Sequence, residues 1–305
     1  MGKIFYLILN MNIMSSVMGI FVLMIRKNKK WPRKIITAMW CIPFIRAVLP
    51  LAINGPFGLM DYLSRYVGRM VPCYKSTAFL TFSYMNFIEQ TDSYHPFHFI
   101  SPKLELLYMV LAVVWGIVTV CLMILWIWLY LDGKKNIKGA VYWKENIWFS
   151  GKVNGGATYG IVSAKILLPY SYNKQDLCYV VDHEKMHIKR KDNFWRLVGF
   201  AVVSVHWFNP LMWYFLKCFL LDIELACDEA VISDYNEAKR KKYAIALLNC
   251  KQVEKGMFIS SFGGSLLQKR IQYILLYKQM TKKVVLCYMV IFCLFLYYFL
   301  TNAMA

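Results

Sequence analysis

One short segment of the sequence combines residue types and a spacing that could bind a metal ion. Residues 183–187 read His-Glu-Lys-Met-His, so two histidines stand four positions apart. On a helix this spacing puts His183 and His187 on one face, about 6 Å apart, where a single zinc ion can join both imidazoles. With 5 histidines and 8 glutamates in 305 residues, only about 0.002 chance matches to His-Glu-x-x-His are expected. Two histidines exposed on a helix surface are therefore the weaker interpretation, and we expect a zinc site.

A third ligand must come from elsewhere, because catalytic zinc generally takes three protein ligands and leaves a fourth position to water. A cluster of five acidic residues runs from Asp222 to Asp234. Glu224 and Asp228 are four positions apart, so on a helix one carboxylate can bind the metal while the other accepts the N–H of a bound imidazole. An acidic helix surface is the alternative, plausible for the cluster alone and weak beside the histidine motif.

The remaining histidines are weaker candidates. His206 lies in an apolar stretch and is more typical of a packed or interfacial side chain than of a ligand. His95 and His98 flank a proline in a segment without helical periodicity, which favours solvated side chains over a metal site.

The stretch between the two motifs decides whether they can share one ion. Residues 194–221 are almost wholly apolar. A single membrane crossing there would place Glu224 and His183 on opposite sides of the membrane. Asn209 and Pro210, near the middle, provide a break, so a helical hairpin that enters and returns is the favoured interpretation. Upstream, residues 157–162 are expected to form an edge strand on which an extended substrate can pair.

The composition indicates an integral membrane protein. Hydrophobic residues make up 59% and charged residues 17% of the chain, with a mean hydropathy of +0.42, against roughly 25% charged residues in soluble domains. Disordered, collagen-like and small disulfide-rich proteins are excluded. The net charge of +19 is interpreted as basic residues that flank membrane spans and meet anionic lipid, so the lipid membrane is an expected partner and direct nucleic-acid binding is not.

Charge patterning predicts the topology. Residues 26–34 hold six basic residues and no acidic residue, which places this loop in the cytoplasm and the N-terminus outside. Residues 132–283 hold 24 basic and 13 acidic residues and are expected to be cytoplasmic too. The predicted order is a transmembrane helix pair in 1–53 (spans 4–25 and 35–53), an extracellular loop in 54–102, a third transmembrane helix in 103–131, the cytoplasmic domain in 132–283, and a fourth helix with a short external tail in 284–305.

Taken in order, these elements resemble the BlaR/MecR-type integral-membrane zinc metallopeptidases, antirepressor transducers of the gluzincin group. The resemblance covers essentially the whole chain. It is carried by the four-span layout, the histidine motif at 183–187, the segment His-Trp-Phe-Asn-Pro-Leu at 206–211, Glu-Leu-Ala-Cys-Asp-Glu-Ala-Val at 224–231, and the region from Ser260 to Ile271 before the last span.

The resemblance implies a mainly α polytopic protein with four transmembrane helices and a cytoplasmic α+β gluzincin-like zinc peptidase domain between the third and fourth. It implies zinc as cofactor, with His183, His187 and Glu224 as ligands, Glu184 as general base, and Asp228 as the carboxylate behind a ligand. The expected activity is that of a metalloendopeptidase in signal transduction at the bacterial cell membrane, with its active site on the cytoplasmic side. The expected substrate is a cytoplasmic protein such as a winged-helix repressor. A quality-control membrane protease and a catalytically idle receptor component are the alternatives.

Two further expectations concern the C-terminal region. Transducers of this family are understood to cleave themselves, which makes Ser261 and Phe262 the candidate cleavage site; a plain linker before a basic helix with Lys269 and Arg270 is the alternative. Transducers that sense β-lactams carry a penicillin-binding domain after the fourth span, whereas this sequence has five residues there. We therefore expect no antibiotic sensing by such a domain, and the external signal or sensor partner stays unassigned.

Overall fold

The computed structural model describes residues 2–28, 30–49, 53–54, 102–161, 163–253 and 263–302. These residues are mainly helical with a few short strands, as expected. The predicted loop residues 55–101, with His95 and His98, and the predicted cleavage residues Ser261 and Phe262 lie outside them. Two compact units make up the chain: Met1–Leu122, Val202–Phe215 and Lys282–Ala305 form the first, and Met123–Ala201 and Leu216–Thr281 form the second.

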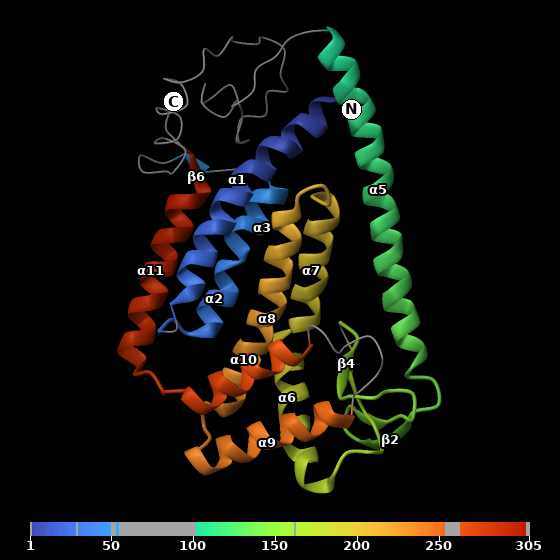
Figure 1. Cartoon of the computed structure of the whole chain (residues 1–305), viewed down its shortest axis with the longest axis vertical. Helices are drawn as coiled ribbons and strands as arrows, with labels where there is room; N and C mark the ends of the chain where they lie inside the picture. The colour runs from blue at the N-terminus through green and yellow to red at the C-terminus, as the bar shows by residue number, and fades with distance from the viewer. Residues whose placement is uncertain are drawn as a thin grey trace. The chain divides into compact units, whose positions relative to one another are not determined.

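The first unit contains the N-terminal helices and the last helix. Helix α1 (Gly2–Lys27) packs along α3 (Cys41–Val48), and α11 (Lys282–Leu300) contacts both α2 (Arg33–Met39) and α3 (Figure 1). A core of Met18, Ile42 and Phe299 joins α1, α3 and α11. Strand β1 (Ile53–Asn54) pairs in parallel with β6 (Thr301–Asn302).

The predicted second span over 35–53 stays a prediction, and its described residues do not form one continuous helix. Two short helices, α2 and α3, replace it and meet at Trp40. Pro43 has no N–H to donate to the carbonyl of Met39, four residues earlier, so the helical hydrogen-bond ladder stops there. The carbonyl of Pro43 instead accepts a hydrogen bond of 2.7 Å from the hydroxyl of Ser15 on α1.

In the part of the chain that the structure describes, two helical segments are long and apolar enough to cross a membrane. They are Met109–Lys135, within α5 (Pro102–Lys135), with a mean hydropathy of 2.7, and Lys282–Phe299, within α11, with 1.8. They coincide with the predicted third and fourth spans. The first two predicted spans are not among them, so the four-span topology is not confirmed and stays a prediction.

The second unit is built on a four-stranded sheet. Its order is β2 (Val141–Lys144), β3 (Ile147–Phe149), β5 (Lys165–Leu168) and β4 (Ala157–Tyr159), with β3 and β5 parallel and the other pairs antiparallel. β4 is therefore an edge strand, as expected for this segment. β5 is the most buried strand, and its Ile166 and Leu168 join Val180 and Val181 of α6 (Lys174–Arg190) in one core.

A second core fixes the helices that surround α6. Helix α9 (Glu237–Val253) packs against both α6 and α10 (Gly263–Leu276). Tyr243 and Leu247 of α9 meet Ile274 of α10 and Val231 of α8 (Pro210–Ile232) in this cluster. The histidine helix is thus held by the sheet and by a layer of helices that follow it in the chain.

The predicted helical hairpin is present. Helix α7 (Asp192–Val205) and α8 lie side by side and are joined by residues 206–209 (Figure 1). The side chain of Asn209 accepts a 2.9 Å hydrogen bond from the N–H of Leu211 and so caps the start of α8. His206 is fully buried, with its Nε2 2.9 Å from the carbonyl oxygen of Ala47, which confirms a packed histidine at this position. Whether the hairpin enters the membrane stays a prediction.

Candidate metal centre

Helix α6 brings His183 and His187 together on one face, as their spacing predicts. The two Nε2 atoms are 3.1 Å apart, and each residue is 5% exposed. The ring planes meet edge to face, at 80°. The pair is buried next to the core that joins α6 to the sheet.

The Nδ1 atom of His187 is held by a residue that follows the helix. Helix α6 ends at Lys191, which adopts a left-handed conformation (φ 56°), and α7 starts at the next residue. This turn folds Asp192 back, so that its Oδ2 lies 2.6 Å from Nδ1 of His187. Burial alone would lower the pKa of His187, but the charge of Glu224 and the Asp192 hydrogen bond outweigh it and raise that pKa.

The Nδ1 atom of His183 faces a tyrosine and an aspartate. The hydroxyl oxygen of Tyr243, on α9, is 2.9 Å away, and the hydroxyl donates to Oδ1 of Asp228 over 2.7 Å. Asp228 is fully buried, and its Oδ1 lies 3.3 Å from the same Nδ1. Asp228 therefore contacts Nδ1 of His183, as expected for the carboxylate partner of a bound imidazole. Tyr243 contacts both side chains through its hydroxyl group.

The two imidazoles fit a bound cation. Each Nδ1 has oxygen partners that can accept its proton, and in the neutral rings this arrangement would turn the lone pairs of both Nε2 atoms toward each other across 3.1 Å. Two converging lone pairs repel unless a proton or a metal ion lies between them. The donor set of two imidazoles and one carboxylate is one that zinc accepts in catalytic sites.

Glu224, on α8, supplies the carboxylate. Its Oε2 is 3.5 Å from Nε2 of His183 and its Oε1 is 3.6 Å from Nε2 of His187. Arg196 donates to Oε1, and Arg270 approaches Oε2 at 3.0 Å. Burial alone would raise the pKa of Glu224, but Arg270, His187 and Arg196 hold it well below its ordinary value. Glu224 is therefore ionised and directed at both histidines, as a ligand must be.

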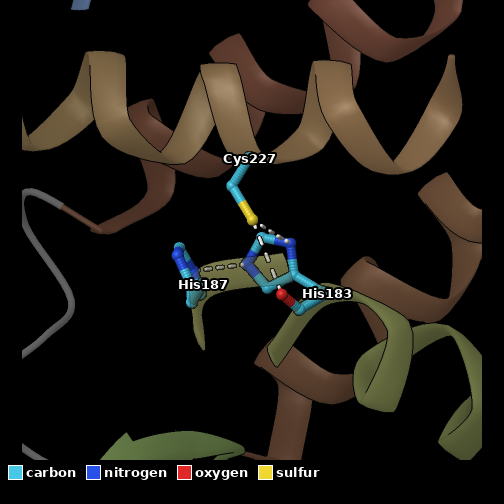
Figure 2. Close-up of side chains that lie close together, drawn as sticks. All are labelled: His183, His187 and Cys227. Atoms are coloured by element: carbon cyan, nitrogen blue, oxygen red, sulfur yellow. Dashed lines mark hydrogen bonds between the residues drawn. The ribbon is translucent and has the colours of Figure 1, made fainter. Parts of the chain in front are cut away.

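Cys227 is the competing candidate for the third ligand. Its Sγ and ring nitrogens of His183 and His187 all lie within 4.8 Å of one another. Figure 2 shows, however, that Cys227 and His187 approach different edges of the His183 ring: the sulfur is 3.6 Å from Nδ1, whereas His187 faces Nε2. Burial, together with Asp228 and Glu224, raises the pKa of the Cys227 thiol in the metal-free fold. The carboxylate of Glu224 instead faces both Nε2 atoms.

Glu184, between the two histidines, is buried at 7% exposure. The hydroxyl of Thr158, on edge strand β4, donates to its Oε2 over 2.8 Å. The side-chain amide of Asn193 donates to the carbonyls of Thr158 and Gly160, at 2.8 and 3.1 Å. These contacts tie the edge strand to α6 and α7 beside the carboxylate that is expected to act as a base.

Sequence reasoning did not find four side chains of this centre: Thr158, Asp192, Tyr243 and Arg270. Asp192 gave one signal, an acidic residue directly before an apolar helix. The other three reach the centre only because separate helices and strands pack together. A local sequence pattern does not indicate such packing.

Comparisons with known proteins identify the family of this chain. The profile of the BlaR1 peptidase M56 family matches residues 6–274. A methicillin resistance mecR1 protein of Staphylococcus aureus is 25% identical over 145 residues, 44% of this chain and 25% of the relative. The regulatory protein BlaR1 of Bacillus licheniformis is 29% identical over 123 residues, 37% of this chain and 20% of the relative. The matched segments cover a fifth to a quarter of the length of these curated relatives. Because the family profile covers most of its length, the chain belongs to the BlaR1 peptidase M56 family.

Proposed function

We propose that this chain is a membrane-bound zinc metalloendopeptidase of a signalling system. His183, His187 and Glu224 bind the zinc ion in this proposal. The observation that carries it is the convergence of two Nε2 atoms, 3.1 Å apart, with a carboxylate at 3.5 and 3.6 Å from them. The buried carboxylate of Glu184 in the same helix supplies the base that hydrolysis needs.

The protein's residues then divide the work of peptide hydrolysis. A zinc ion at this position supplies a Lewis acid that polarises the peptide carbonyl and makes water more acidic. Glu184 accepts the proton as water attacks the carbonyl carbon, and it returns that proton to the amine nitrogen when the C–N bond breaks. The hydrogen bond from Thr158 fixes one oxygen of Glu184 and so orients the other for this transfer.

Edge strand β4 supports an extended polypeptide as the substrate. β4 pairs with β5 on one side, and the carbonyls of Thr158 and Gly160 point to the other side, where Asn193 binds them. An extended substrate can pair with this edge by displacing the amide of Asn193. The substrate in this proposal is a cytoplasmic protein such as a winged-helix repressor, because the matched relatives are regulatory and resistance proteins.

The location and the self-processing of the protein are part of the proposal. Residues 132–283 face the bacterial cytoplasm, below a multi-pass membrane region, so the metal centre meets cytoplasmic substrates. Cleavage between Ser261 and Phe262 by the protein's own centre would separate the catalytic segment from the last span. The external signal is not assigned.

Two variants test the proposed roles. In full-length protein purified in detergent, Glu184→Ala is expected to keep its zinc and to lose hydrolysis of fluorescein-labelled casein, because all three ligands remain while the base is gone. Glu224→Ala is expected to lose zinc itself. Metal analysis and the casein assay measure both outcomes. Normal zinc content in Glu224→Ala would return the third-ligand role to another residue, with Cys227 next.

The same Glu184→Ala variant tests self-cleavage. A C-terminal tag on the wild-type protein in membranes is expected to yield a small fragment that Glu184→Ala lacks. A fragment of equal abundance in both proteins would show that another protease makes the cut.

A further inference from the structure

Arg270 lies inside the metal centre, although the sequence predicts only a basic helix at this point. It belongs to α10, and its side chain is 11% exposed, whereas its neighbour Lys269 is exposed. A buried guanidinium is unfavourable unless carboxylates surround it. The groups that surround Arg270 therefore indicate its role in the fold.

The guanidinium touches three groups of the centre. Its Nε and Nη2 donate to the two oxygens of Asp228, over 2.7 and 2.8 Å. Its Nη1 lies 3.0 Å from Oε2 of Glu224, and its Nη2 lies 3.2 Å from Nε2 of His183. One side chain thus contacts the proposed carboxylate ligand, a proposed histidine ligand, and the carboxylate behind that histidine.

The charges explain why an arginine is needed. Asp228 is fully buried and Glu224 is 26% exposed, so two negative groups would repel each other with little screening by water. The planar guanidinium binds Asp228 with two parallel hydrogen bonds and still offers an N–H to Glu224, a fixed geometry that a compact ammonium group does not reproduce. Arg196 also binds Glu224, but at its other oxygen and from a side chain that is 32% exposed.

We propose that Arg270 is a positioning residue for metal binding. It fixes the carboxylate of Glu224 directly, and it fixes His183 through Asp228 and Tyr243. This inference rests on the proposed ligand set of the preceding section. It makes the metal centre dependent on α10, which five residues, 277–281, connect to the last helix, α11.

Arg270→Lys is the test variant, studied as full-length protein in detergent. Lysine keeps the positive charge next to Asp228, so the fold is expected to survive, as circular dichroism will report. It cannot span both carboxylates, so zinc affinity in a chelator competition is expected to fall at least about tenfold. The visible absorption of bound Co²⁺ is expected to change as well, because the Glu224 carboxylate is no longer held. Lys269→Gln, one position away and exposed, is the matched control and is expected to bind zinc like the wild type.

Reference variants distinguish a failure of this inference from a failure of the proposed function. Wild-type zinc affinity in His183→Ala and Glu224→Ala would contradict the ligand set and thus the proposed function. Loss of zinc in those two variants, with wild-type or tighter binding in Arg270→Lys, would overturn the Arg270 inference alone. Should Arg270→Lys not fold, Asp228→Asn/Arg270→Gln removes the buried charge pair together. It is expected to bind zinc more weakly than Asp228→Asn, and equal affinities would overturn the inference.

Discussion

The hydrogen bond between Asp192 and His187 makes a testable contribution to metal affinity. Replacing Asp192 by Ala removes the group that fixes the ring and the proton on Nδ1. Loss of such a partner typically weakens metal binding by about 10- to 100-fold. Zinc competition with a chelator measures this, and Asp132→Ala is the control, because Asp132 forms only an exposed ion pair with Lys135. An unchanged affinity in Asp192→Ala would contradict the role.

The raised pKa of His187 adds a pH signature to this prediction. Its charged form is favoured in the metal-free fold, so the stability it contributes is present below the unfolded pKa and is lost as the pH rises through the folded pKa. Zinc must displace that proton, so zinc affinity is expected to fall as the pH drops below the raised pKa. In Asp192→Ala the fall in zinc affinity is expected to begin at a lower pH, because the Asp192 hydrogen bond that helps to raise the pKa of His187 is gone.

At the residue scale, the sequence makes the proposed ligands easier to recognise than the residues that contact them. His183 and His187 are recognisable because one helical turn relates them, and Glu224 and Asp228 because a second helix repeats that spacing. Tyr243 and Arg270 reach the same centre from α9 and α10, which contact α6 and α8 only in the folded chain. The sequence predicts only a basic helix around Arg270. Neither charge nor periodicity distinguishes the buried Arg270 from its exposed neighbour Lys269.

The close packing of α7 on α8 predicts the effect of a substitution at Gly199. A Cβ there would lie 3.0 Å from Leu216 and 3.1 Å from Phe219. Gly199→Val is therefore expected to push the helices apart and to lower stability by about 1–3 kcal/mol. Thermal unfolding in detergent measures this, and Gly116→Val, whose Cβ meets nothing within 4 Å, is the control. Equal loss in both variants would mean that the packing is not responsible.

At the element scale, breaks in helices were partly foreseeable. Asn209 and Pro210 stand together in an apolar stretch, and the hairpin turn lies there. Pro43 also stands in an apolar stretch, inside the predicted span 35–53, and no break in the helix was predicted there. The same missing N–H acts in both places. Only the hairpin was inferred, because the shared metal site required a break there, whereas no prediction required a break at Pro43.

The whole molecule is expected to cross the membrane four times, with residues 132–283 inside. A single cysteine at position 236, in a variant without native cysteines, is expected to resist a membrane-impermeant maleimide added to intact cells and to react after lysis. A cysteine at position 303 is the control and is expected to react from outside. Labelling of position 236 in intact cells would overturn the topology. Hydropathy identifies a segment of α5 and a segment of α11, in the predicted third and fourth spans, as long and apolar enough to cross a membrane.

The order of the contacts along the chain has a consequence for biosynthesis. The histidines, Glu224, Asp228 and Tyr243 all emerge from the ribosome before Arg270 does. Until translation has passed residue 270, Asp228 and Glu224 lack the guanidinium that binds them in the finished fold. Because synthesis adds roughly 5–20 residues per second, this centre acquires the contact with Arg270 only seconds after its first proposed ligand has been made.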